Sequence, residues 1–208
     1  MKVELLRLTE RPLNLISEAY RICYASAPKD NPEEENKFIK ACIRNQHTSP
    51  LEHAAATFLI SGISRPCSQQ IERHRIASYT QESQRYVNAE NAKFILPASI
   101  ANNASRFSVY DELLRRATAT YNLLIFSGVK KEDARFVLPQ AVTTKMMMTI
   151  NFRALRNFLN LRLDVHAQWE VRQVAEAMVA ELNKVSPELV DTIFGDILNV
   201  KGSVEDKR

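Results

Sequence analysis

Glycine is the residue whose placement most limits what this chain can fold into and bind. The 208 residues include only four glycines, Gly62, Gly128, Gly195 and Gly202, and no two of them lie within six positions of each other. The glycine-rich turn of a dinucleotide-binding fold and the P-loop both need clustered glycines, so neither motif can be written anywhere in the sequence. Any phosphate group of a ligand must therefore be held by side chains.

The composition predicts one globular domain over residues 1–208. Hydrophobic residues make up 45% and charged residues 25% of the chain, which are ordinary values for a globular protein. The net charge of +4 favours anionic partners. The cysteines Cys23, Cys42 and Cys67 are odd in number and widely separated, which favours reduced thiols with structural roles.

Neither a membrane segment nor a metal site is expected. No apolar run approaches the roughly 20 residues that span a bilayer. Glu4 and Arg7 lie where a signal peptide would be apolar, so we expect a cytoplasmic protein. The histidines show no HExxH spacing and the cysteines no CxxC spacing, which argues against a dedicated zinc site.

Hydrophobic periodicity predicts an α/β (α+β) fold with a central sheet flanked by helices. We expect strands, or extended chain in the third case, at 2–8, 53–63, 84–87 and 143–151. We expect helices at 13–23, 32–45, 67–73, 102–127, 130–137, 152–161 and 167–185. Pro187 should end the last of these helices, and residues 201–208 should form a solvated, frayed tail.

Residues 69–86 are unusually polar for the middle of a chain. Gln70 and Arg73 are three apart on a predicted helix and so share a face. Arg73, Arg75 and Arg85 supply planar donor groups that suit a phosphate or a pyrimidine carbonyl. Taken by itself, however, the segment is more simply explained as a solvated helix end and turn.

Residues 151–162 form an amphipathic helix at about 100° per residue. Its apolar face carries Leu155, Phe158 and Leu159, and its polar face carries Arg153, Asn157 and Asn160. The apolar face should pack in the core, and the polar face can either bind a ligand or simply meet solvent.

Both segments match the motifs of one family. Arg73-His74-Arg75, seven further residues and then Ser83-x-Arg85-Tyr86 resemble the signature of flavin-dependent thymidylate synthases. The second block of that family is similar to Asn151-x-Arg153 and to Asn157-x-x-Asn160-Leu161-Arg162-x-Asp164-x-His166-Ala167-Gln168-Trp169-Glu170. Glu52-His53 and the stretch from Ala134 to Pro139 also fit, so the resemblance covers about residues 47–172.

The resemblance implies conversion of dUMP to dTMP, with methylenetetrahydrofolate as carbon donor and FAD reduced by NADPH. It also implies a homotetramer with active sites between subunits. The FAD contacts would be Ser49, Arg73, His74, Arg75, Gln81, Asn151, Arg153 and Asn157, with His166 nearby. The dUMP contacts would be Gln70, Arg73, Gln81, Ser83, Gln84, Arg85, Arg162 and Arg135, the last from a neighbouring subunit.

Arg162 is the candidate catalytic residue. Methylation at C5 of uracil needs electron density at that carbon, and a guanidinium beside N3 and its carbonyl can stabilise the pyrimidine as an anion. The route needs no enzyme thiol. No activating group accompanies Cys67, and no base at a recognisable spacing supports Ser83 as a nucleophile.

Three positions depart from the common form of the motif, and two other functions remain open. Thr80 replaces a frequent Asn, and Gln81-Glu82 stands where Glu-Gln is common, so a carboxylate is displaced by one position. A related enzyme that hydroxymethylates or otherwise modifies a pyrimidine nucleotide would use the same binding residues. A basic nucleic-acid-binding module is disfavoured because neither segment interleaves stacking aromatics with its arginines.

Overall fold

The structure is a computed structural model that describes residues 1–205, with only the backbone described for 201–205. The strands are β1 (Lys2–Leu8), β2 (Ala55–Ser64), β3 (Ser78–Gln81) and β4 (Thr143–Asn151). The α-helices are α1 (Pro12–Cys23), α2 (Pro32–Arg44), α3 (Arg65–Glu72), α4 (Ala98–Ala101), α5 (Ala104–Phe126), α6 (Lys131–Ala134), α7 (Phe152–Arg162), α8 (Trp169–Val185) and α9 (Pro187–Glu205). Short 3-10 helices are η1 (Ser49–His53) and η2 (Arg135–Val137).

The strands form a four-stranded antiparallel sheet in the order β1-β2-β4-β3. Strand β4 has a regular alternation, with Thr144, Met146, Met148 and Ile150 buried and the residues between them at least partly exposed. This period of two buries one face of the strand. Helix α8 packs against β1. The predicted α/β class with a helix-flanked sheet is therefore confirmed.

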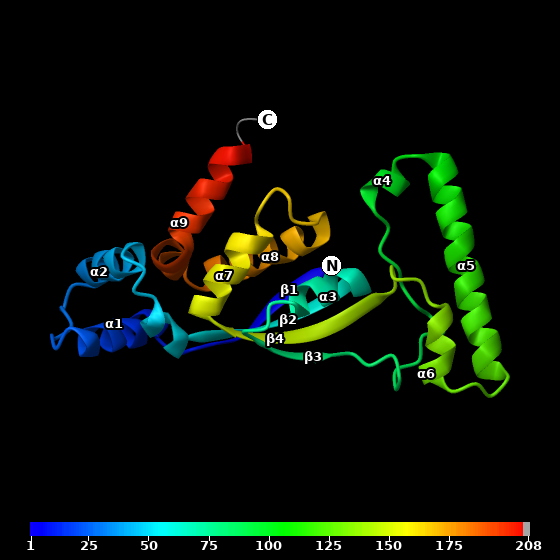
Figure 1. Cartoon of the computed structure of the whole chain (residues 1–208), viewed down its shortest axis with the longest axis horizontal. Helices are drawn as coiled ribbons and strands as arrows, with labels where there is room; N and C mark the ends of the chain where they lie inside the picture. Colours follow the sequence, from blue (N-terminus) through cyan, green and yellow to red (C-terminus); the bar gives the residue numbers. More distant parts are fainter. Residues whose placement is uncertain (206–208) are drawn as a thin grey trace. The chain divides into compact units, whose positions relative to one another are not determined.

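The chain divides into two compact units, each assembled from separate stretches of sequence. The first unit contains Met1, Ser61–Arg73 and Thr80–Met146. The second unit contains Lys2–Ile60, His74–Tyr79 and the chain from Met147 onward. In the first unit α4 and α6 pack on α5, and in the second α2 and α7 pack on α9 (Figure 1). The single domain expected from composition remains a prediction.

Local capping signals place several helices where the sequence predicts them. The Asn31 side chain accepts a hydrogen bond from Glu33 N (3.0 Å) at the start of α2, and Ser64 accepts from Cys67 N (3.2 Å) at the start of α3. Asn151 accepts from Ala154 N (2.8 Å) and starts α7. Gly128 follows α5 with a φ of +86°, a conformation that suits glycine and ends the helix.

Two expected strands differ from the structure, and one short helix was missed. Residues 84–87 are not extended: the chain turns there, and the strand lies at Ser78–Gln81. Strand β2 begins at Ala55 rather than at residue 53, because the 3-10 helix η1 extends to His53. Helix α4 was not predicted, since its four residues are too short to show periodicity.

Pro187 ends α8 as predicted, but it also starts a helix that the sequence analysis did not foresee. Proline lacks a backbone N–H and is favoured at the first position of a helix, so one residue can end α8 and begin α9. Helix α9 buries Leu189, Ile193 and Phe194. It includes the backbone of 201–205 from the predicted frayed tail, and residues 206–208 lie outside the described part of the chain.

Candidate functional site

The motif segment after β3 in the first unit is a tight turn organised by Ser83. The Ser83 hydroxyl accepts from Arg85 N at 3.2 Å. Its backbone carbonyl accepts from Tyr86 N at 3.1 Å and from Val87 N at 3.0 Å. The turn leaves Ser83 and Arg85 exposed, so their side chains face solvent rather than the core.

Arg85 and Arg135 meet at one glutamate. Arg85 Nε lies 2.5 Å from Glu132 Oε2, and Arg135 Nε donates to the backbone carbonyl of Glu132 at 3.1 Å. Both arginines were expected in the dUMP site, with Arg135 reaching it from a neighbouring subunit. Within one chain they contact different groups of Glu132, its carboxylate and its backbone carbonyl. Glu132 was missed, because nothing in the sequence pairs it with Arg85.

The other expected residues of the first unit lie on α3 and β3. Gln70 is half-buried on α3 and Arg73 is exposed at its end. The Gln81 side chain points inward to a polar network. In the amide orientation that satisfies its neighbours, its oxygen accepts from Ser68 Oγ (2.7 Å) and Arg65 Nη1 (3.1 Å). Neither Arg65 nor Ser68 was expected in the site.

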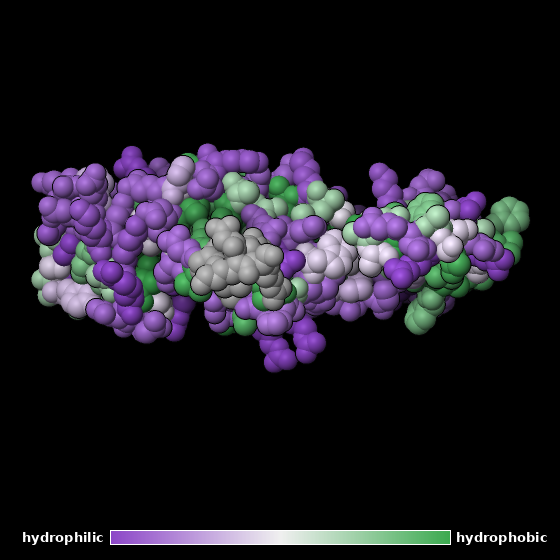
Figure 2. All heavy atoms as spheres, turned by 90° about the horizontal axis from the view of Figure 1, so that it is seen from above, coloured by the Kyte–Doolittle hydropathy of each residue, from purple (hydrophilic) through white to green (hydrophobic). Residues whose placement is uncertain are grey.

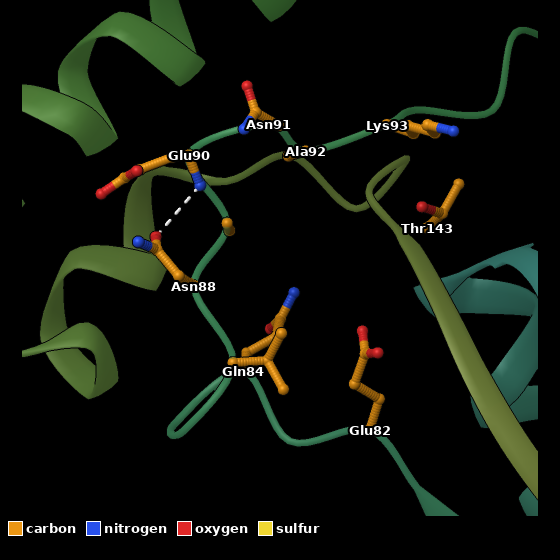
Figure 3. Close-up of a pocket in the computed structure, with 10 residues that line it drawn as sticks. Glu82, Gln84, Asn88, Glu90, Asn91, Ala92, Lys93 and Thr143 are labelled. Atoms are coloured by element: carbon orange, nitrogen blue, oxygen red, sulfur yellow. Dashed lines mark hydrogen bonds between the residues drawn. The ribbon is translucent and has the colours of Figure 1, made fainter.

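A polar hollow of about 340 Å³ lies beside the turn at Ser83 in the first unit. Gln84 and Glu82 line it from one side, and Asn88, Lys93 and Thr143 contribute to the rest of its wall (Figure 3). Of the expected dUMP contacts in this unit, Gln84 is the one that reaches the hollow.

In the second unit, the motif histidine is buried against α7. The His74 ring is 7% exposed and meets the edge of Phe158 with the ring centroids 5.5 Å apart. Burial lowers the pKa of His74, and the positive charge of Arg162 lowers that pKa further, while a hydrogen bond to the Ala154 backbone opposes the change. His74 is therefore a neutral imidazole at pH 7, and its Nε2 has no hydrogen-bond partner among the described residues.

Arg162 is the last residue of α7 and is half-buried at the start of the connection that leads into α8. That connection is ordered by Asp164, whose carboxylate accepts from His166 N (3.0 Å). Gln168 caps α8 by accepting from Glu170 N (2.9 Å). The His166 side chain is exposed. Arg162 thus lies near enough to His74 to lower its pKa, and His166 lies on the turn that follows.

The polar face of α7 lines a second hollow, of about 370 Å³. Arg153, Asn157 and Asn160 line this hollow together with Thr48 and Gln46. The predicted division of α7 is confirmed, since Leu155, Phe158 and Leu159 are fully buried.

The arginines on this face differ in their partners. Arg153 pairs with Glu52, and both side chains are about half exposed. Arg156 pairs with both carboxylate oxygens of Asp196, at 2.8 and 2.6 Å, so it holds α9 on α7. Arg153 is thus a half-exposed side chain at the hollow whose partner is Glu52, and Arg156 ties α7 to α9.

Two of the expected FAD contacts, Ser49 and Arg75, lie outside α7. Ser49 is exposed on η1, which packs against α7. Arg75 is exposed on the short segment between α3 and β3.

The described residues contain neither a cluster of metal ligands nor a membrane-spanning helix. Among residues 1–205 no group of three or more His, Cys, Asp or Glu side chains gathers closely enough to hold a metal ion. In the same part of the chain, no helix combines the length and apolar character needed to cross a membrane.

The helix-rich α/β chain carries two exposed sets of arginine and amide donors, the groups that suit an anionic ligand where no glycine-rich loop is present. Comparison with known proteins gives the family. Residues 4–188 match the family model described as "Thymidylate synthase complementing protein". The chain therefore belongs to the family of flavin-dependent thymidylate synthases.

Individual relatives agree with that assignment over nearly the whole chain. The chain is 41% identical over 204 residues to a flavin-dependent thymidylate synthase of Geobacter sulfurreducens, which covers 94% of this chain and 86% of the relative. It is 41% identical over 194 residues to that of Pyrococcus furiosus, covering 88% and 80% of the two chains. It is 38% identical over 207 residues to that of Nitratidesulfovibrio vulgaris, covering 90% and 84%.

Proposed function

We propose that this protein converts dUMP to dTMP, with methylenetetrahydrofolate as the carbon donor and NADPH-reduced FAD as the hydride donor. Besides the family, one observation carries the proposal. Arg85 and Arg135, from motif segments 50 residues apart in the sequence, converge on Glu132. Arg85 contacts the Glu132 carboxylate and Arg135 contacts its backbone carbonyl, so the first unit presents guanidinium donors that suit a phosphate monoester in a chain without a glycine-rich loop.

In this proposal the first unit supplies most of the nucleotide contacts. Arg85 would bind the phosphate of dUMP, and Arg135 would reach the nucleotide from a neighbouring subunit. Ser83 and Gln84, on the exposed turn, would hydrogen-bond to the nucleotide, and Gln70 and Arg73 would extend the contact from α3. Gln81 would act from the end of β3.

The second unit carries side chains that fit FAD. The hollow on α7 is lined by amide and guanidinium groups, which suit the phosphates and polar ring edges of a flavin nucleotide. Arg153, Asn151 and Asn157 would hold FAD from α7 with Ser49 on η1. Arg73, His74, Arg75 and Gln81 would contact it from the first motif, with His166 near it. FAD, when bound, supplies the reducing equivalents of the reaction.

Arg162 would stabilise the pyrimidine as an anion, because its guanidinium can donate to N3 and the adjacent carbonyl. Because His74 is neutral, the positive charge beside it comes from the Arg162 guanidinium. The Cys67 thiol is fully buried in the first unit, which supports a route without an enzyme thiol.

We also propose that the protein is a cytoplasmic homotetramer. Several large apolar side chains on and near α5 are exposed, with Val109 at 71%, Leu123 at 63% and Phe126 at 91%. Figure 2 shows hydrophobic side chains gathered over this part of the surface. Exposed apolar clusters of this kind favour burial between copies of a chain.

A spectroscopic titration tests the function. Purified protein given FAD should show a flavin absorbance spectrum, and anaerobic NADPH should bleach it faster when dUMP is present. Product analysis after adding methylenetetrahydrofolate should then give dTMP, whereas a hydroxymethylated nucleotide would change the assigned product. Protein that binds no FAD would contradict the proposal, and salt-dependent DNA or RNA binding would become the alternative to measure.

A further inference from the structure

The Gln81 side chain is held in a polar network inside the first unit. Its amide oxygen accepts from Arg65 Nη1 at 3.1 Å, Ser68 Oγ at 2.7 Å and Thr144 Oγ1 at 3.3 Å. Its amide nitrogen donates to Glu72 Oε1 at 3.2 Å. Ser68 is fully buried and Thr144 is 4% exposed, so water does not readily replace these partners.

The hydrogen-bonding chemistry of Arg65 and Glu72 fixes the orientation of the Gln81 amide. A guanidinium can only donate hydrogen bonds, and an ionised carboxylate can only accept them. Arg65 therefore requires the oxygen of Gln81, and Glu72 requires its nitrogen. With both partners present, only one of the two amide orientations satisfies every neighbour.

We propose that Glu72 is a positioning residue, which orients the Gln81 side chain for nucleotide binding and steadies the end of β3 that leads into Ser83 and Arg85. This inference rests on the proposed function. It also identifies the carboxylate that matters near Gln81. The sequence pointed to Glu82, but Glu82 follows the end of β3 and lines the separate hollow of Figure 3.

The network should work only when one member of the pair at positions 72 and 81 is a carboxylate and the other an amide. Glu72→Gln places two amides together, and because an amide both donates and accepts, Gln81 can then flip. Gln81→Glu places two carboxylates about 3 Å apart, and like charges at that distance repel. The double variant Glu72→Gln/Gln81→Glu restores one carboxylate, which now faces Arg65, and one amide donor.

The test measures dTMP formation and dUMP binding for the two single variants and the double variant, each loaded with FAD. We expect each single variant to raise the KM for dUMP and the calorimetric Kd for dUMP about tenfold, the loss of one charge-assisted hydrogen bond. We expect the value of kcat to change less than about threefold, and the double variant to return within about threefold of the wild-type KM. Glu112→Gln, which removes a surface carboxylate paired with Arg116 on α5, is the charge-matched control and should change neither constant.

Three results would overturn the proposal. The first is a double variant as impaired as the sum of the singles, because the two positions would then act independently. The second is a loss confined to thermal stability and the amount of folded enzyme, which would make the network structural. The third is a raised KM in Glu82→Gln but not in Glu72→Gln. Failure of the proposed function itself is distinct, because wild-type protein would then neither bind dUMP nor form dTMP.

Discussion

Phe158 should control both the stability of α7 and the ionisation of His74. The ring is fully buried, and its edge contact with His74 has an interplanar angle of 81°. Phe158→Leu keeps an apolar side chain but loses this contact and leaves a small void. We expect a loss of about 1–2 kcal/mol in the free energy of unfolding.

The control is Phe152→Leu on the same helix. Phe152 is equally buried, and it makes an edge contact with Phe194 at a centroid distance of 5.8 Å instead of with the histidine. Urea denaturation should give similar losses for the two variants. NMR titration should show the His74 pKa rising toward its ordinary value of 6.5 in Phe158→Leu only, because water then reaches the imidazole.

The same His74 pKa in both variants would refute this reasoning. If the His74 pKa is unchanged in Phe158→Leu, the ring does not shield the imidazole. If both variants raise the pKa, the effect comes from loosening of α7 as a whole and not from the contact between the two rings.

Further variants test the roles assigned above. Arg162→Ala should retain the FAD absorbance and lower dTMP formation about a hundredfold or more, and wild-type activity would exclude the catalytic role. Cys67→Ala should remain active and lose only about 1 kcal/mol on urea denaturation, because one buried sulfur is removed; an inactive but folded variant would point to a catalytic thiol. Arg156→Met should lower the free energy of unfolding by about 1–3 kcal/mol, because it breaks the paired contact with Asp196, and an unchanged value would show that the pair contributes nothing. The folded-state pKa of His74 lies below 6.5, so its contribution to stability is present above pH 6.5 and is lost as the pH falls through the folded pKa; melting temperatures should fall less between pH 7.5 and 5.5 in His74→Asn than in the wild type.

The elements that sequence predicted best are those whose signals are local. Helix α7 shows its apolar face directly in the spacing of Leu155, Phe158 and Leu159, and Asn151 supplies its cap. Strand β3 was missed because its residues are polar and its pairing with β4 is non-local. Likewise, the tail after Pro187 becomes a helix because Leu189, Ile193 and Phe194 find a core to pack into.

The candidate site was predictable as residue types but not as contacts. The motif spacing identified Arg85 and Arg135, yet no pattern in the sequence showed that both reach Glu132. The motif also identified Gln81. Only the fold shows that its side chain points inward and that Glu82 lines the other hollow. Partners that are distant in the sequence are set by packing, which a single sequence does not display.

Two of the site arginines form ion pairs with glutamates, and these pairs affect how the protein interacts with other anions. Arg85 meets Glu132 and Arg153 meets Glu52, and the side chains of both arginines are more than half exposed. Without these pairs, a chain with a net charge of +4 would expose both guanidinium groups to polyanions such as nucleic acids. A polyanion that binds Arg85 or Arg153 must compete with these glutamates for the guanidinium. Binding of an anion at either arginine therefore carries the cost of breaking an ion pair, which a ligand with further polar contacts can offset.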